Sequence, residues 1–275
     1  MRQAAEKQAE PSGQEKSTIM TLVHNLLRHR YALLLPYAVL AGTTFLSPRH
    51  AQAAHSLITQ FQGCPADGQT GPVAAPTVLP TPFALAAPLP AGLTLYASQD
   101  LAAVGPVGWH CLQLYGSSGT FLMLRPEAFP QSDRAALEAQ TNGPGIQVSS
   151  TFGTTSGRFD VARTVARAFP NYQTYVQSVI QEGIEPASHF PSGPYPDDQI
   201  TREGDRDVAF TTPPHTTGFG TESRLIANNS PIQGLLHLTT AHDLMALQVR
   251  LPPSQSHLTQ TIIEQTRKLN ADFGR

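Results

Sequence analysis

Six polar side chains in two long loops, between residues 190 and 225, are the candidates for a ligand site. They supply a phenol, three carboxylates, an imidazole and a guanidinium: Tyr195, Asp197, Asp198, His215, Glu222 and Arg224. The second loop is glycine-rich, and such a loop can bring backbone N–H groups close to a ligand while an arginine pairs with an anion. Long loops in compact domains are often functional. The pattern predicts a ligand-binding cleft, and the alternative is a plain connection with an exposed arginine.

The same two loops could also carry a hydrolase site, provided that His215 lies within hydrogen-bond reach of a carboxylate. No sequence motif assigns a catalytic residue. Neither residues 116–119 nor residues 153–157 fit the Gly-x-Ser-x-Gly pattern of serine hydrolases. Ser156, in the second stretch, is better explained as a helix N-cap. An exported hydrolase with a site in the 190–225 loops is therefore the alternative to a binding protein.

Metal ligation has little support in the sequence. The carboxylates between Asp197 and Asp207 do not follow the spacing of a calcium loop, and two interleaved arginines can neutralise them. His215, His237 and His242 could meet in space, but no Cys or His-Glu-x-x-His arrangement accompanies them. We predict no metal site and no cofactor.

The chain has two cysteines, Cys64 and Cys111. His110 adjoins Cys111, but neighbours on a strand point to opposite faces, so a catalytic thiol–imidazole pair is not expected. An even cysteine count in an oxidising compartment favours one disulfide, Cys64–Cys111. The chain-entropy estimate for its stabilising effect is roughly 4 kcal/mol at most.

The N-terminal region has the three parts of a secretory signal. Arg28 and Arg30 precede an apolar run over residues 31–46, and Ala51-Gln52-Ala53 follows it. We predict a signal peptide over residues 1–53, with Met20 as the true start if the leader has conventional length, and an exported periplasmic or extracellular chain without a membrane span. The alternative is an uncleaved membrane anchor.

The charge balance of residues 54–275 limits the partners. This part holds 11 Arg and 1 Lys against 17 Asp and Glu, so that 12 − 17 gives a net charge of −5. An acidic surface does not attract nucleic acid or anionic lipid, both of which favour clustered basic residues. We predict no nucleic-acid partner.

Proline and the apolar pattern divide the exported part into an arm and a domain. Residues 65–92 carry seven prolines and should run extended over the surface, so we place a Pro-rich arm at 54–92 and one domain at 93–275. Strand patterns and helical spacing predict an α+β fold with a mostly antiparallel sheet and a few helices. The predicted strands are 93–98, 109–115, 120–124, 145–152, 207–211, 232–239 and 244–251, and the predicted helices are 158–169, 172–182 and about 257–270.

Several blocks of the chain resemble a family of exported bacterial proteins with no established function. They are Cys64-Pro65-Ala66-Asp67-Gly68 with Gly71-Pro72, Gly108-Trp109-His110-Cys111, Thr155-Ser156-Gly157-Arg158-Phe159, Phe190-Pro191-Ser192-Gly193-Pro194-Tyr195-Pro196-Asp197-Asp198 and Gly220-Thr221-Glu222-Ser223-Arg224-Leu225. The resemblance spans nearly all of residues 63–251. It implies export and a single domain, and it assigns no catalytic residue.

The sequence leaves the ligand unknown. We expect an exported protein with a binding or cell-envelope-associated role, without catalysis, whose partner is an unidentified ligand or envelope component. A third class, an interaction module held by the proline-rich arm, predicts that deleting residues 65–92 abolishes partner capture without unfolding the domain.

Overall fold

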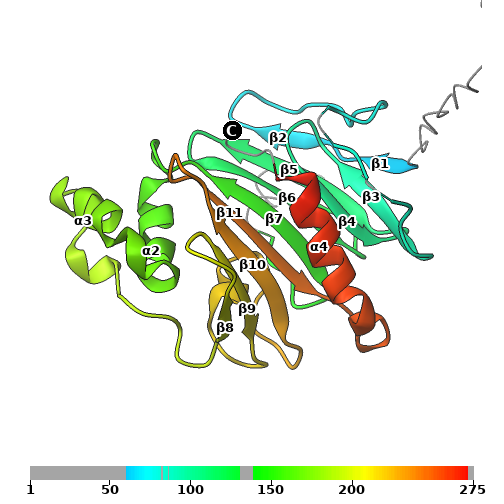
Figure 1. Ribbon diagram of the computed structural model, residues 1–275. Coiled ribbons are helices and arrows are strands. Elements are labelled where there is room, and N and C mark those ends of the chain that lie inside the picture. Colours follow the sequence, from blue (N-terminus) through cyan, green and yellow to red (C-terminus); the bar gives the residue numbers. More distant parts are fainter. Residues whose placement is uncertain (1–59, 82, 86, 131–138, 272–275) are drawn as a thin grey trace, which may run out of the picture. The chain divides into compact units, whose positions relative to one another are not determined.

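The computed structural model describes residues 60–81, 83–85, 87–130 and 139–271. The chain divides into two units, Met1–Ala54 and His55–Arg275, and all described residues belong to the second. The predicted signal peptide therefore lies outside the described residues. The second unit is one α+β domain built around a mostly antiparallel sheet, which confirms the predicted fold class (Figure 1).

Eleven strands form two sheets in the described part of the chain. The larger sheet has the order β2-β5-β6-β7-β11-β10-β9-β8, and the smaller has the order β1-β3-β4. Parallel pairing is confined to β1 with β3 and β2 with β5. The strands are β1 Phe61–Gly63, β2 Ala66–Gly68, β3 Leu93–Ala97, β4 Ala102–Pro106, β5 His110–Gly116, β6 Gly119–Arg125, β7 Gly145–Thr151, β8 Gln199–Arg202, β9 Asp207–Thr212, β10 Ile232–Leu238 and β11 Leu244–Arg250.

Two hairpins form the centre of the larger sheet. Strands β5 and β6 are joined by Ser117-Ser118 between two glycines, and β10 and β11 are joined by residues 239–243. Both hairpins confirm the sequence prediction. Alternating side chains send every second residue of each strand to one face of the sheet, so these strands supply two different surfaces.

The α-helices are α2 Arg158–Ala168, α3 Gln173–Gln181 and α4 Thr259–Leu269. Short 3-10 turns are η1 Pro170–Tyr172, η2 Ala187–His189, η3 Phe219–Thr221 and η4 Pro253–Leu258. Figure 1 shows α4 lying across the larger sheet and the α2–α3 pair at one end of it. The predicted cap by Ser156 is wrong, because Gly157 occupies the N-cap of α2 and no side chain caps it.

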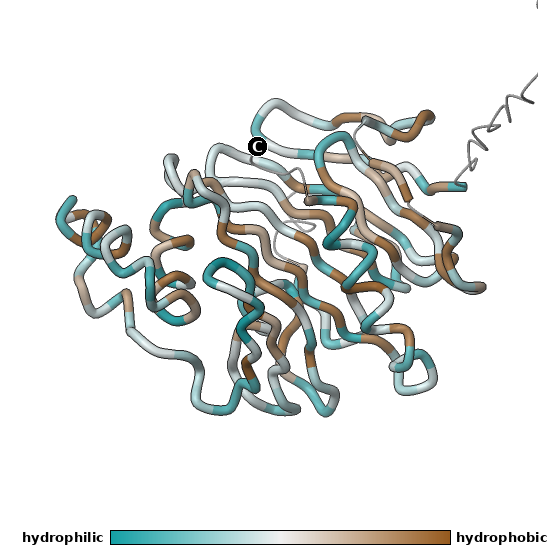
Figure 2. The backbone as a smooth tube through the Cα atoms, viewed as in Figure 1, coloured by the Kyte–Doolittle hydropathy of each residue, from teal (hydrophilic) through white to brown (hydrophobic). Residues whose placement is uncertain are grey.

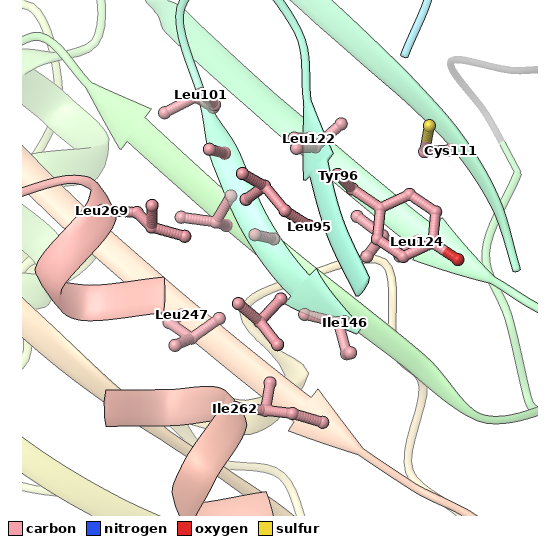
Figure 3. Packing of buried hydrophobic residues seen from close by; sticks show 14 of the residues in the cluster. Leu95, Tyr96, Leu101, Cys111, Leu122, Leu124, Ile146, Leu247, Ile262 and Leu269 are labelled. Atoms are coloured by element: carbon pink, nitrogen blue, oxygen red, sulfur yellow. The ribbon is translucent and has the colours of Figure 1, made fainter. Parts of the chain in front are cut away.

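One face of the larger sheet is closed by α4 and the smaller sheet. Figure 3 shows Leu122 and Ile146 of the larger sheet facing Leu95 of β3 and Ile262 of α4, and all four are fully buried. Helix α4 is also fixed by a hydrogen bond from the Val104 N–H to Thr266 Oγ1, at 3.0 Å. Since each buried methylene contributes about 0.8 kcal/mol, this closed face supplies much of the stability of the domain.

A second apolar cluster joins α2 and α3 to the opposite face of the sheet. Val161 and Val165 of α2 belong to the same buried cluster as Leu236 and Leu238 of β10. The helices cover only one end of this face. Figure 2 shows hydrophobic residues following the strands while hydrophilic ones gather on the loops and on α4.

The disulfide Cys64–Cys111 is present, as predicted, with a Cα–Cα distance of 5.3 Å. Cys64 lies between β1 and β2, where the chain crosses from the smaller sheet to the larger one, and Cys111 lies on β5. The bond therefore fixes this crossing to the larger sheet. Beyond β2, the described residues between 69 and 92 contain no helix or strand. None of the helices in the described ranges is long and apolar enough to span a membrane.

Candidate functional site

A cleft of about 940 Å³ lies over the face of the larger sheet that α4 does not cover. Its floor comes from β5, β6, β7, β11 and β10. Its walls are α2, which contributes Arg163 and Thr164, residues Thr221–Arg224, and the residues around Asp67 of β2. We call residues 219–226 the wall segment. The cleft therefore lies where the α2–α3 cover ends.

Small side chains at the centre of the floor make this face concave. Ser149 of β7 pairs with Ala246 of β11. The outer neighbours in the same row are large. Ser149 also pairs with Phe121 of β6, and Ala246 also pairs with Leu236 of β10. Residues paired in register point to the same face. The row therefore forms a trough with two low positions between two bulky ones.

Two glutamines stand side by side in the next row of the floor. Gln147 and Gln248 are register partners on β7 and β11, and 6% and 1% of their surfaces are exposed. Gln147 Oε1 accepts a hydrogen bond from the Arg224 N–H at 2.9 Å, and Gln248 Nε2 donates to the Phe219 carbonyl at 3.4 Å. Gln248 Oε1 is buried without a hydrogen-bond partner in the described part of the chain. The pair thus holds the wall segment at Phe219 and at Arg224, and it leaves one acceptor without a partner among the described residues.

A buried arginine holds the far end of the wall segment. Arg250 of β11 is 2% exposed, and its guanidinium donates to the carbonyls of Gly143 at 2.9 Å, Thr141 at 2.8 Å and Ile226 at 2.5 Å. Burial lowers the pKa of Arg250, yet an arginine remains charged in proteins, so the carbonyl dipoles have to satisfy it. Arg250 therefore fixes the wall segment and residues 141–143 to the end of the sheet.

Glu222 lies in the cleft wall and is held by two hydroxyls. Tyr195 Oη donates to Glu222 Oε1 at 2.6 Å, and Thr164 Oγ1 donates to Oε2 at 3.3 Å. Although more than a third of the residue surface is exposed, burial of the carboxyl group raises the pKa of Glu222 above its ordinary value. Burial and then the neighbouring carboxylate raise the pKa of Tyr195, so the phenol keeps its proton and remains a donor. The Arg167 guanidinium covers the Tyr195 ring at 4.0 Å.

Asp198 supports the wall segment from behind and does not line the cleft. Its carboxylate accepts from Thr212 Oγ1 at 2.6 Å and from the Phe219 N–H at 2.8 Å. Burial is the main reason why the pKa of Asp198 is raised. A Cβ on Gly218 would lie 2.0 Å from Asp198 Oδ1, so only glycine permits this close approach. The role of Asp198 is to position the start of the wall segment.

Arg224 supplies a positive charge to the cleft. Its guanidinium carbon lies 5.6 Å from the centre of the Phe121 ring, and it forms no ion pair with a carboxylate of the described residues. The other arginine of the lining, Arg163, is paired with Asp160 and, at 2.8 Å, with Glu185. Arg224 is therefore the cleft cation that remains free to pair with an anionic ligand.

The remaining two predicted site residues do not join this arrangement. Asp197 is exposed and does not line the cleft. His215 is exposed with a φ of 61°, and the hydrogen bond it makes within the described ranges is from its backbone N–H to the Asn228 carbonyl at 2.7 Å. The structure thus brings together Tyr195, Glu222 and Asp198 around the wall segment, and no carboxylate of the described residues pairs with His215.

Sequence reasoning missed the polar floor. Along β7, Gln147 and Ser149 alternate with Ile146 and Val148, and this alternation indicates a strand whose second face is not part of an apolar core. Among the residues that the structure describes, no group of three or more His, Cys, Asp or Glu could hold a metal ion. The arrangement offers hydrogen-bond groups, a cation without a carboxylate partner among the described residues and a trough lined in part by apolar side chains, which are the elements of a binding site.

No family model, curated protein or solved structure matches the chain. The resemblance of its sequence blocks to a family of exported proteins stays a prediction. The functional argument depends on the geometry of the cleft.

Proposed function

We propose that the protein is an exported binding protein that holds a ligand in the cleft over the larger sheet and does not transform it. The observation that carries the proposal is the trough made by Ser149 and Ala246, which leaves about 940 Å³ beside positioned polar groups. Pockets of several hundred Å³ with apolar walls and a few fixed polar groups are typical ligand sites.

The chemistry of the cleft favours binding over hydrolysis. General acid–base catalysis needs a base within hydrogen-bond reach of its proton, most often a histidine near a carboxylate. The described residues that line the cleft include no histidine, and Glu222 is held by two hydroxyl donors. An exported hydrolase built from the 190–225 loops therefore has less support than a binding protein.

Export rests on two features of the chain. The basic flank, apolar run and Ala51-Gln52-Ala53 form a secretory signal, and the Cys64–Cys111 disulfide suits an oxidising compartment. The proposed location is the periplasm or the extracellular space. Intact mass of the protein from its host should give an N-terminus near Ala54, and a mass that rises by about 2 Da on reduction of the disulfide.

Filling the trough tests the binding role. Ser149→Trp places an indole at the low point of the floor, whereas Gln177→Trp adds the same group to an exposed position of α3. We would screen short peptides, saccharides and carboxylic acids by thermal shift. A ligand at 100 times its dissociation constant stabilises the folded state by about 2.7 kcal/mol.

The expected result is a compound that raises the melting temperature of the wild type and of Gln177→Trp, with no effect on Ser149→Trp. Compounds that stabilise all three proteins equally bind elsewhere and would overturn the proposal. Turnover of the stabilising compound by the wild type would instead support the hydrolase.

A further inference from the structure

The two floor glutamines lie next to each other, and each keeps one amide group that bonds to no described residue. The backbone of the wall segment uses Gln147 Oε1 and Gln248 Nε2. The groups left for a ligand are the amide N–H of Gln147 and Oε1 of Gln248. In an extended peptide, the N–H and C=O of one residue point to the same side, as they do between antiparallel strands. The glutamine pair is therefore complementary to one residue of an extended peptide.

The charge of the cleft specifies an anionic group next to that residue. Arg224 adjoins the glutamine pair, because its backbone N–H donates a hydrogen bond to Gln147 Oε1. No carboxylate of the described residues pairs with the Arg224 guanidinium. A planar guanidinium can bind a carboxylate through two parallel hydrogen bonds. A peptide chain end supplies such a carboxylate within one residue of a backbone N–H and C=O.

The rest of the cleft favours apolar side chains on the ligand. Beyond the glutamine row, small polar residues such as Ser149 alternate with apolar ones on the floor, and the apolar ones are Leu114, Phe121, Leu236, Leu244 and Ala246. Two walls of the cleft carry carboxylates, Asp160 on α2 and Glu222 in the wall segment itself, and these would repel acidic side chains of the ligand.

We propose, on the basis of the binding role argued above, that the cleft takes the C-terminal end of a short apolar peptide. The terminal carboxylate of the peptide pairs with Arg224, and the backbone N–H and C=O of the preceding peptide residue bond to Gln147 and Gln248. The apolar side chains of the peptide lie in the trough. Gln248 Oε1 is closed to solvent, so the proposal requires the amide to turn toward the cleft on binding and to exchange its 3.4 Å hydrogen bond to the Phe219 carbonyl for one to the ligand. Satisfying this buried acceptor recovers the cost of leaving it unpaired.

The experiment measures a dansylated Gly-Leu-Leu tripeptide as the free acid and as the C-terminal amide, by fluorescence titration of the full mature chain. We expect the wild type to bind the acid at least about tenfold more tightly, as a charge-assisted hydrogen-bonded pair predicts. Arg224→Gln should bind acid and amide equally, while the exposed Arg202→Gln keeps the preference. Equal binding of both peptides by the wild type, or a preference kept in Arg224→Gln, would overturn the peptide-terminus assignment.

The cleft-filling variant separates this proposal from the proposed function. If no peptide binds but another compound stabilises the wild type and not Ser149→Trp, the ligand class is wrong and the binding role stands. If the free acid binds Ser149→Trp as tightly as the wild type, the cleft is not the peptide site. Gln248→Leu gives a further check, since it should weaken the acid and the amide alike.

Discussion

Strand β7 directs Ile146 and Val148 toward α4 and directs Gln147 and Ser149 toward the cleft. On the side of α4, Ile146 and Val148 are fully buried among apolar neighbours from two sheets and a helix. On the cleft side, the two glutamines are covered by the wall segment, but Ser149 stays partly exposed on the floor of the cleft. The same strand thus contributes to a closed face and to an open one.

The difference between the two faces separates stability from binding. The closed face gains its free energy from apolar area removed from water, so each position is sensitive to volume. The open face keeps small and polar residues that contribute little to burial but position hydrogen-bond groups. Substitutions on the two faces should therefore affect different measurements.

The largest loss of stability is expected on the closed face. Leu247→Ala removes a fully buried side chain of β11 and leaves a cavity, which should lower the free energy of unfolding by about 4 kcal/mol. Ser149→Ala, on the open face of β7, should change it by no more than about 0.5 kcal/mol. Urea unfolding measures both, and equal losses would show that the two faces are not distinct in stability.

Arg250 lies on the open face but is expected to contribute strongly to stability, so its substitution should give the next largest loss of unfolding free energy. Arg250→Met leaves the carbonyls of Thr141, Gly143 and Ile226 without their donor, at an expected cost of about 3 kcal/mol. Because these carbonyls fix the wall segment, peptide binding should weaken as well. Exposed Arg202→Met is the control. A loss below about 1 kcal/mol would mean that the carbonyls find water instead.

Much of this fold follows from local patterns in the sequence. The hairpin of β5 and β6 is predictable because two apolar runs flank a Gly-Ser turn, and α4 is predictable from its apolar stripe. Strand β4 is not, because its sequence Ala-Ala-Val-Gly-Pro has no alternation. Gly105 on that strand packs against Leu124, whose Cδ2 would lie 2.7 Å from an added Cβ. Its strand form depends on tertiary packing, which a single-sequence pattern does not contain.

The site was predictable only where the residues belong to one stretch of chain. Glu222 and Arg224 were identified because a glycine-rich loop with charges is a local signal, and both line the cleft. Gln147 and Gln248 were missed because their pairing depends on the register of two strands far apart in the sequence. The prediction for Ser156 failed because a glycine takes the cap position.

The smallest expected effect is a pH dependence of stability contributed by the open face. The pKa of Glu222 is raised in the folded protein above its ordinary value of 4.5. Between these two values the folded state binds more protons than the unfolded state, so the contribution of Glu222 to the unfolding free energy falls as the pH rises from about 4.5. Glu222→Gln should remove the part of this pH dependence that Glu222 contributes. The part contributed by Asp198, whose pKa is raised as well, should remain.

Glu182 gives a control of opposite sign. The hydrogen bond from Arg158 lowers the pKa of Glu182, so its contribution to stability is present above the ordinary value and is lost as the pH falls through the lowered one. Glu182→Gln should therefore flatten the acid side of the stability curve, whereas Glu222→Gln flattens the side above pH 4.5. Urea unfolding at a series of pH values separates the two. An unchanged slope above pH 4.5 in Glu222→Gln would mean that water, and not the cleft wall, surrounds this carboxylate in solution.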